Sequence, residues 1–182
     1  DTQEVTVTVT DENETPTITS STTAFTIAEN QTAIPNATII ATDVDANDTL
    51  TFEISNRDLV IDANGVVSFA TAPDFETITS VTATVTVTDS GRLTDTQDIT
   101  ITVTDVNEAP TITSRDTEFT IAENETVIRG ATITATDQDA NDTFTFSVSG
   151  DLLQIGTDGV LSFISAPDFE TTTEAITATV TV

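Results

Sequence analysis

Residues 81–110 read VTATVTVTDSGRLTDTQDITITVTDVNEAP, and the pattern of this stretch decides the fold. Apolar residues alternate with polar ones, mostly threonine, over residues 81–87 and again over 99–103, and Gly91 lies in the polar segment between the two runs. Alternation with period two places one face of a β-strand on a core and the other in water. The stretch therefore predicts two strands with a turn between them, followed by an acidic linker that ends at Pro110.

The chain contains two copies of this kind of sequence, so a tandem array is the first interpretation. Pro16 recurs as Pro110, and longer motifs recur in the same order: AEN at 28–30 and 122–124, DVDAND at 43–48 and DQDAND at 137–142, and APDFE at 72–76 and 166–170. Most apolar positions between these motifs keep only their character, whereas the carboxylates largely keep their identity. Whatever the carboxylates do is therefore done once in each repeat.

The composition is that of an acidic chain that can still bury a core. Its 182 residues carry a formal net charge of −27 and include no Cys, Met, Trp, Tyr or His, and 37% of them are hydrophobic. Acidic chains with few aromatic residues are often disordered, but the strict alternation of apolar residues argues against disorder here. The length allows one or two domains, and the repeat favours two. Without cysteine, no disulfide stabilises the fold.

The charge also limits the partners. Arg57, Arg92, Arg115 and Arg129 are the only positively charged side chains. Nucleic acid and anionic membranes are therefore disfavoured, and no apolar run is long enough to be inserted across a bilayer. A cation is the natural partner of such a chain.

Each repeat is predicted to form a Greek-key β-sandwich of about seven strands, an all-β fold typical of short strands with turn signals at intervals of about eight to twelve residues. In repeat one we expect a split first strand around Phe25 and Ile27, and then strands at 37–42, 49–55, 59–61, 66–69, 81–88 and 97–104. Gly65, Gly91 and the Pro-Asp pairs mark turns. The expected core positions are Ile27, Ile39, Leu50, Phe52, Ile54, Ile61, Phe69, Val85, Ile101 and Val103.

The carboxylates fall at the predicted strand ends. In a sandwich with Greek-key connections the strand ends gather at two poles, so acidic residues that are far apart in sequence can converge there. Convergent carboxylates repel one another unless a cation lies among them. A hard oxygen set of this size suits calcium (Ca²⁺), which takes about six to eight oxygens in irregular geometry, better than magnesium or a soft transition metal. The absence of His and Cys removes the usual zinc ligands.

One local alternative, an EF-hand loop, is excluded by the sequence. The stretch DVDANDTLTFEI would need Gly at its sixth position and Glu at its twelfth. Asp48 and Ile54 stand there in repeat one, and Asp142 and Val148 stand there in repeat two.

The chain resembles a cadherin repeat, and specifically the cadherin-like repeats of large bacterial surface adhesins. The resemblance is carried by AEN, ATDVDANDTLTFEI, LVIDANGVVSFATAPDFE and the stretch quoted first, in this order. It implies that residues 1–14 are the last strand and linker of a preceding repeat, that 15–108 are repeat one, and that 109–182 are repeat two. In that family calcium ions lie between successive repeats and stiffen the array.

The resemblance also implies three groups of calcium ligands. One site between the repeats would take Glu29, Asp74 and Glu76 from the base of repeat one, Asp105, Asn107 and Glu108 from the linker, and Asp137 and Asp139 from the top of repeat two. Half of an equivalent upstream site would consist of Asp11, Asn13, Glu14, Asp43, Asp45 and Asp89. The remaining residues would wait for a downstream repeat: Glu123, Asp168 and Glu170.

Two departures from the family limit what the resemblance implies. The linker reads NEAP where the family has Asn-Asp-Asn-x-Pro, so the number of ions per junction is left open. Cell adhesion through an exchanged Trp is not implied, because the chain has no Trp.

The two ends of the sequence suggest how copies meet. Residues 1–16 align with 95–110, and Val182 corresponds to Val87, so repeat two lacks its own last strand. By itself it would expose an open sheet edge. We expect the N-terminal strand of another copy to fill this edge, either within one continuous array or by strand donation between separate subunits.

A calcium-stiffened spacer in an extracellular fibre or adhesin stalk is the function that the residues favour, with neighbouring repeats or subunits, calcium, and a cell surface or biofilm as partners. A module that binds carbohydrate or protein at its loop tips is the alternative, and it is disfavoured by two near-identical copies with few aromatic residues. An enzyme is also disfavoured. Asp74 and Glu76 imitate a glycosidase carboxylate pair, but they recur in a repeated turn with no His, Cys or Lys to assist.

Overall fold

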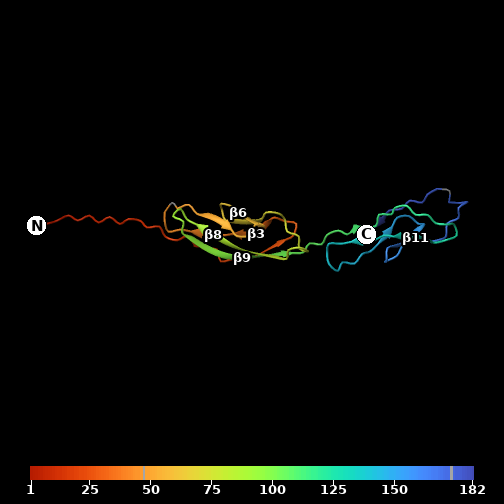
Figure 1. Ribbon diagram of the computed structural model, residues 1–182, viewed down its shortest axis with the longest axis horizontal. Coiled ribbons are helices and arrows are strands. Elements are labelled where there is room, and N and C mark those ends of the chain that lie inside the picture. The colour runs from red at the N-terminus through yellow and green to blue at the C-terminus, as the bar shows by residue number, and fades with distance from the viewer. Residues whose placement is uncertain (47, 173) are drawn as a thin grey trace. The chain divides into compact units, whose positions relative to one another are not determined.

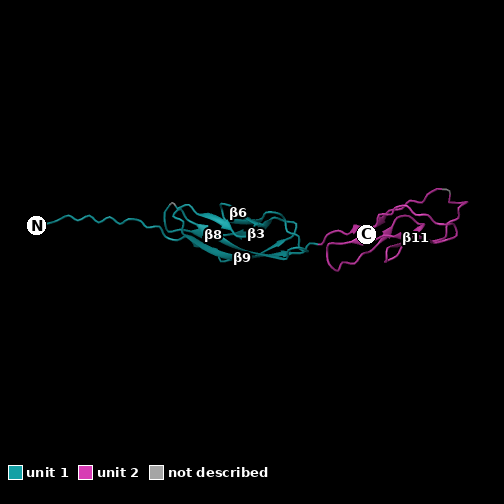
Figure 2. Ribbon diagram, viewed as in Figure 1, with its two compact units in different colours: residues 1–106 teal, residues 107–182 magenta. Residues whose placement is uncertain are grey.

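The computed structural model describes residues 1–46, 48–172 and 174–182, and these form two compact units, residues 1–106 and residues 107–182 (Figure 2). All regular secondary structure in the described ranges is β-strand, which confirms the predicted all-β class. No helix capable of spanning a membrane is found among the described residues.

The described residues of unit 1 form nine strand elements, labelled in Figure 1 where there is room. Residues 1–14 precede them as an exposed segment without regular structure. The larger sheet has the order β2-β9-β8-β5, a second sheet has the order β3-β7-β6, and β1 pairs with β4. The elements are β1 (Thr17–Ile18), β2 (Ala24–Ala28), β3 (Ala33–Thr38), β4 (Ala41–Thr42), β5 (Thr51–Ile54), β6 (Leu59–Ile61), β7 (Val66–Phe69), β8 (Ser80–Thr88) and β9 (Thr94–Thr104).

The nine elements correspond to the predicted seven strands, because two strands are split. The first is divided into β1 and β2, as expected from the sequence. The second was predicted as a single strand over 37–42, and this is wrong: β3 ends at Thr38 and β4 begins at Ala41. Between them the Ile39 N–H donates to the Gly65 carbonyl at 2.8 Å, and Ile40 is exposed. The chain thus leaves β7 and passes to the edge beside β1.

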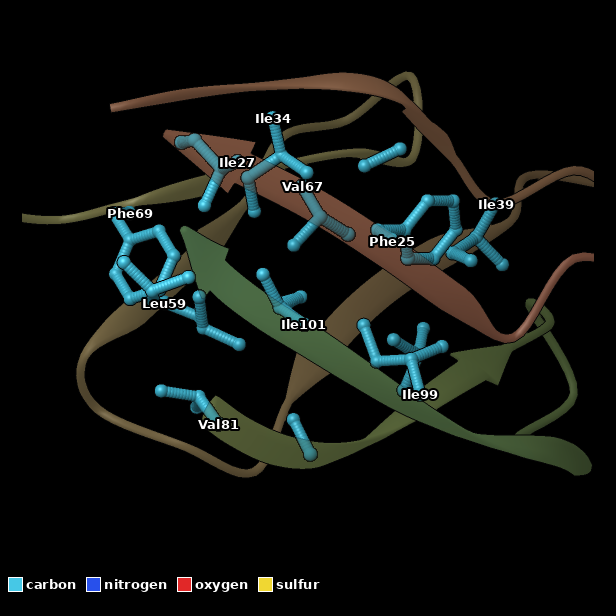
Figure 3. Close-up of a cluster of buried hydrophobic side chains, with 14 residues drawn as sticks. Phe25, Ile27, Ile34, Ile39, Leu59, Val67, Phe69, Val81, Ile99 and Ile101 are labelled. Atoms are coloured by element: carbon cyan, nitrogen blue, oxygen red, sulfur yellow. The ribbon is translucent and has the colours of Figure 1, made fainter. Parts of the chain in front are cut away.

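The core of unit 1 lies between the two sheets, where alternate side chains of both point inward (Figure 3). Ile39 and Ile101 are completely buried, and each aliphatic side chain of this size contributes about 1.5–3 kcal/mol by leaving water. Of the predicted core positions, Ile27, Ile39, Phe69, Val85, Ile101 and Val103 are buried, and Phe52, Ile54 and Ile61 pack against the cluster half-buried. Leu50 is only half-buried and lies outside the cluster, so its prediction was wrong.

Gly65 sets the turn before β7. Its φ of +77° is in the left-handed region, and a Cβ there would collide with the Ile39 carbonyl oxygen. Gly159 is its counterpart in unit 2, with φ +74° and the same approach to the Ile133 carbonyl. Only glycine combines this φ with so close a backbone contact.

Unit 2 repeats the order of unit 1 but has a less complete larger sheet. Its sheets are β11-β15-β14, the pair β10-β12 and the pair β13-β16. Residues 118–122, the counterpart of β2, form no strand. A smaller core contains Ile128, Ala131, Leu153, Leu161 and Phe163. The elements are β10 (Thr111–Ile112), β11 (Val127–Thr132), β12 (Ala135–Thr136), β13 (Ser147–Val148), β14 (Leu153–Ile155), β15 (Val160–Phe163) and β16 (Val180–Thr181).

Candidate metal centres

The first acidic cluster lies at the end of unit 1 that receives residues 11–16. The loop after β4 supplies Asp43 and Asp48, and the turn after β8 supplies Asp89. One carboxylate oxygen from each of the three lies within 4.8 Å of the other two. Asp89 is 5% exposed, so this cluster reaches into the protein rather than lying on its surface.

Two oxygens in this cluster are buried without a hydrogen-bond donor. Asp43 Oδ1 accepts the Asp45 N–H at 2.9 Å, and Asp48 Oδ1 accepts the Ser90 hydroxyl. The second oxygen of each, Oδ2, is buried and has no partner. Buried polar atoms are normally hydrogen-bonded, and a native exception calls for an explanation such as an ion.

A cation among these carboxylates would offset their mutual repulsion. Two like charges at about this separation repel by about 1 kcal/mol in water and by about 3–4 kcal/mol near a protein surface. Calcium binds carboxylate, amide and carbonyl oxygens in flexible geometry, whereas magnesium demands a near-ideal octahedron. The residues present therefore fit calcium, and the two orphaned oxygens are the acceptors that it would satisfy.

Residues 11–16 form the linker that enters unit 1, and a backbone N–H and a side-chain amide of this linker donate hydrogen bonds to aspartates at this end of the unit. The Glu14 N–H donates to Asp45 Oδ2 at 2.9 Å, and Asn13 Nδ2 donates to Asp89 Oδ2 at 2.8 Å. The pKa of Glu14 is raised, chiefly by its side-chain hydrogen bond with Asp45, then by loss of solvent and by the charges of Asp45, Asp11 and Asp43. Crowded carboxylates thus surround the linker as well.

The opposite end of unit 1 is organised around Glu29, which closes β2 and is 1% exposed. Glu29 accepts the Phe75 N–H through Oε2 and the Val106 N–H through Oε1, both at 2.8 Å. The turn that contains Asp74 and Glu76 is therefore held beside the start of the outgoing linker.

Glu76 brings this end of unit 1 close to further carboxylates. It offers an oxygen within 4.8 Å of Glu29 and of Asp105. Burial raises the pKa of Glu76, and its hydrogen bond with Asp74 and the charge of Glu29 raise it further. Loss of solvent and the neighbouring carboxylates both disfavour the charged form of Glu76.

Unit 2 repeats two contacts from the end of unit 1 that holds the first cluster, but it forms a different group of three aspartates. The Glu108 N–H donates to Asp139 Oδ2 at 2.8 Å, as Glu14 does to Asp45, and the Asp139 N–H donates to Asp137 Oδ1 at 3.1 Å. Asp137, Asp139 and Asp142 offer oxygens within 4.8 Å of one another. Asn107 Nδ2 donates to the Glu108 carbonyl at 2.8 Å.

The far end of unit 2 also has a carboxylate group, but an exposed one. Glu123, Asp168 and Glu170 offer oxygens within 4.8 Å of one another. The Phe169 N–H donates to Glu123 Oε2 at 3.1 Å, which repeats the contact between Phe75 and Glu29. Glu123 is exposed, whereas Glu29 is buried.

The structure places the predicted ligands unequally. Asp43 and Asp89 lie in one cluster of unit 1, and the other acidic groups described above are divided between the two units. Asp45 instead accepts the linker backbone, and Asp11 is exposed and belongs to none of the groups found among the described residues. Sequence reasoning missed Asp48 and Asp142, although the recurrence of a third aspartate in DVDAND and DQDAND was a usable signal.

Comparison with known proteins agrees with this architecture. Residues 13–102 match a family described as bacterial Ig domain. No curated protein matches the chain. The bacterial Ig match and the solved cadherins described next confirm the predicted resemblance to cadherin-like repeats of bacterial surface proteins.

Several solved cadherin structures share the fold. A mouse cadherin-23 EC22-24 structure aligns with TM-score 0.59 and 22% identity over 91% of this chain, and human protocadherin-24 EC1-2 aligns with TM-score 0.59 and 21% identity over 88%. Drosophila N-cadherin EC1-4 aligns with TM-score 0.65 and 23% identity over 87%. This chain spans 58%, 82% and 42% of those three chains, respectively. The chain therefore has a cadherin-like and Ig-like β-sandwich fold.

Proposed function

We propose that the chain is a structural repeat of an extracellular bacterial fibre or adhesin stalk, in which bound calcium holds each linker to its sandwich. The observation that carries this proposal is the pair of buried Oδ2 atoms of Asp43 and Asp48, which have no donor and lie with Asp89 in one cluster. A structural role, rather than a catalytic one, accounts for a cluster of which Asp43 and Asp48 recur in the second copy as Asp137 and Asp142.

One of the residues that would hold the ion, Asp89, already binds the linker through Asn13. Asp43, Asp48 and Asp89 would supply carboxylate oxygens beside Asn13 in unit 1, and Asp137, Asp139 and Asp142 would do so beside Asn107 in unit 2. When bound, calcium supplies a positive charge among carboxylates that otherwise repel one another. The side chains at the opposite end of unit 1, Glu29, Asp74, Glu76 and Asp105, form a second set. A cation with ligands from both sets would join successive repeats and stiffen an array.

The proposed location follows from the affinity expected for such sites. Calcium sites of extracellular modules bind with dissociation constants of about 10⁻⁴ to 10⁻³ M. Extracellular calcium is concentrated enough to fill such sites, and contacts with a cell surface or biofilm would occur in the same environment. At ten times the dissociation constant, each filled site adds about 1.4 kcal/mol of stability.

The test is calcium titration of the 182-residue chain, followed by isothermal calorimetry and by thermal unfolding. We expect saturable binding and a melting temperature that rises with calcium and falls in excess chelator. Magnesium at the same concentration should have a smaller effect, because the sites are irregular oxygen sets. An unchanged melting temperature together with no heat of binding would rule out the proposed function.

A further inference from the structure

One edge of the smaller sheet of unit 2 is open. The sheet order is β11-β15-β14, so β11 is an edge strand. The pair β10-β12 covers only the continuation of this edge at residues 135–136, where Thr111 lies opposite Thr136. Within the ranges that the structure describes, residues 125–129 therefore have no strand on the side away from β15.

The backbone of this edge is oriented for pairing. Val127 lies opposite Ser162 on β15, and the Phe163 N–H donates to the Thr126 carbonyl at 2.9 Å. Because hydrogen-bonded and non-hydrogen-bonded pairs alternate along an antiparallel ladder, Val127 and Ser162 form a non-hydrogen-bonded pair. The N–H and the carbonyl of Val127 therefore point away from β15, toward the open edge.

Unit 1 has the same edge strand but blocks it with a proline. β3 is the edge of the order β3-β7-β6, and Pro35 of β3 stands where β11 has Arg129. Proline has no N–H to donate, and its use on edge strands is one way in which native sheets avoid pairing with one another. Unit 2 lacks this proline and has Val127, which is 62% exposed, where unit 1 has Ala33. The two repeats thus differ in whether this edge can accept a strand.

The side chains of the open edge are complementary to themselves. Val127 and Arg129 are exposed and Ile128 is buried, so the strand alternates through residue 129, and its irregular part follows with Gly130 at φ +78°. Glu125, Val127 and Arg129 are therefore successive residues on one face. If the segment pairs with its own copy antiparallel about Val127, each Glu125 lies opposite an Arg129. Opposite charges that face each other across two strands stabilise the pairing.

We propose that two copies of the chain pair edge to edge through residues 125–129 of unit 2, antiparallel about Val127, so that their two three-stranded sheets become one. Val127 would exchange both backbone hydrogen bonds with Val127 of the second copy. At each end of the contact Glu125 and Arg129 would exchange two more, and their side chains would form an ion pair. The contact uses the same patch on both copies, so it is isologous and closes at a dimer.

The charge of the chain makes this register specific. With a formal net charge of −27, two copies repel one another over most of their surfaces. An antiparallel register centred on Glu125 or on Arg129 would add like charges opposite each other, whereas the register centred on Val127 matches opposite charges at both ends. Salt screens the general repulsion, so the dimer should strengthen with NaCl. Calcium takes no part in the contact, which therefore goes beyond the proposed function.

The experiment is sedimentation equilibrium of the 182-residue chain in chelator over a range of NaCl concentrations. We expect a monomer–dimer equilibrium. Arg129→Pro, which copies Pro35, should weaken dimerisation by about tenfold or more, because it removes a donor at both ends of the contact. Arg129→Glu should weaken it by about tenfold, and Glu125→Arg together with Arg129→Glu should restore it to within about threefold. The matched control is Arg57→Glu, the same change of charge at an exposed position of unit 1, and it should change dimerisation by less than about threefold.

Amide hydrogen exchange locates the contact. The amides of Val127 and Arg129 should become protected on dimerisation, and the amide of Ala33, the counterpart of Val127, should not change. A melting temperature shows whether Arg129→Pro folds; if it does not, the two charge variants decide. A monomer at all concentrations, a dimer that a folded Arg129→Pro leaves unchanged, or a charge exchange that fails to restore association would each overturn the proposal.

Discussion

At the scale of single residues, the carboxylates divide into those with donors and those without. Asp89 accepts the Leu93 N–H at 2.8 Å and the Asn13 amide at 2.8 Å, so both its oxygens are engaged. Asp43 and Asp48 each keep one buried oxygen without a donor. Asp43 and Asp48 are therefore the two cluster residues with an oxygen available to a bound ion, and Asp48 is the one chosen for substitution.

The substitution Asp48→Asn should separate the repulsion among the carboxylates from their binding of an ion. In chelator the variant should be at least as stable as the original protein, because one of three neighbouring like charges is removed, at about 1 kcal/mol per pair in water. Calcium affinity should fall by about tenfold or more, because the affinity of such sites follows the number of charged ligands. Thermal unfolding with and without calcium measures both.

The matched control is Glu53→Gln, which removes a charge from the exposed face of β5, away from the cluster. It should leave the calcium-induced rise in melting temperature unchanged. A variant Asp48→Asn that loses stability in chelator and keeps its calcium response would contradict this account of the cluster.

Asp62 provides a pH-dependent test that does not involve the metal. Its Oδ1 accepts the Val66 N–H at 2.9 Å and the Asn64 N–H at 2.8 Å, and these bonds hold its pKa below the ordinary value of 3.8. A carboxyl whose folded pKa is lowered stabilises the fold above its unfolded pKa and loses that contribution as the pH falls. We expect Asp62→Ala to lower the melting temperature at pH 7, and the difference to vanish as the pH falls below about 4.

Unit 2 suggests the rescue for this variant. Gly156 replaces Asp62 there, and Asp158 replaces Asn64 and accepts the Val160 N–H at 3.2 Å. The double variant Asp62→Gly and Asn64→Asp should therefore recover part of the lost stability at pH 7. If it recovers none, the acceptor at this turn is not what stabilises it.

The residue scale also shows where sequence reasoning reached its limit. Most of the carboxylates that lie in acidic groups could be predicted, because DVDAND, APDFE and AEN recur in order, and their role as ligands stays a prediction. The spacing of Asp48 in the sequence did not place it in this cluster, because its carboxylate comes close to those of Asp43 and Asp89 only through the fold. The backbone role of Asp45 toward Glu14 depends on the fold in the same way.

At the scale of elements, two glycines of unit 2 separate the effect of backbone conformation from that of steric space. Gly159 lies in the turn before β15, and Gly130 lies in β11. Gly159 and Gly130 have nearly the same φ, +74° and +78°. A Cβ at Gly159 would collide with the Ile133 backbone, whereas a Cβ at Gly130 would meet nothing within 4 Å. An alanine at either position would have the same unfavourable φ, but only at Gly159 would its Cβ also clash with the backbone of Ile133.

We predict that Gly130→Ala destabilises unit 2 by about 1 kcal/mol, which is the cost of a left-handed conformation in an L-residue. Gly159→Ala should cost about 2 kcal/mol more, because the strand spacing must also shift. Denaturant unfolding of both variants gives the difference. Equal losses would mean that the close approach of Ile133 does not constrain this turn.

The strands themselves could be predicted wherever alternation is long. β8 was predicted over 81–88 and lies at Ser80–Thr88, because its inward positions are Val and Ala throughout. β9 was predicted over 97–104 and begins earlier, at Thr94, because its apolar inward positions start only at Ile99 and its first half-buried positions are polar. The split of the second strand could not be predicted, since Ile39 and Ile40 are both apolar and only the hydrogen bond from Ile39 to Gly65 shows where the chain changes sheets. Leu50 was misplaced because the alternation begins before the strand does.

At the scale of the whole molecule, the formal charge of −27 is the dominant property. We predict that chelation changes the small-angle scattering profile toward that of a more flexible chain, and that calcium restores it. Sodium chloride should restore it only in part, because salt screens repulsion beyond about one Debye length but supplies no ligand-bridging ion. Identical profiles in calcium and chelator would contradict a stiffening role.

The direction of one strand pair has a mechanical consequence. β2 and β9 are parallel neighbours over five residue pairs, so traction between the start of β2 and the end of β9 acts along both strands. All their hydrogen bonds are then loaded in shear at once, whereas a hairpin pulled at its open end would unzip bond by bond. Each sandwich with this pair should resist stretching up to a sharp rupture force, as is useful in a tether under flow.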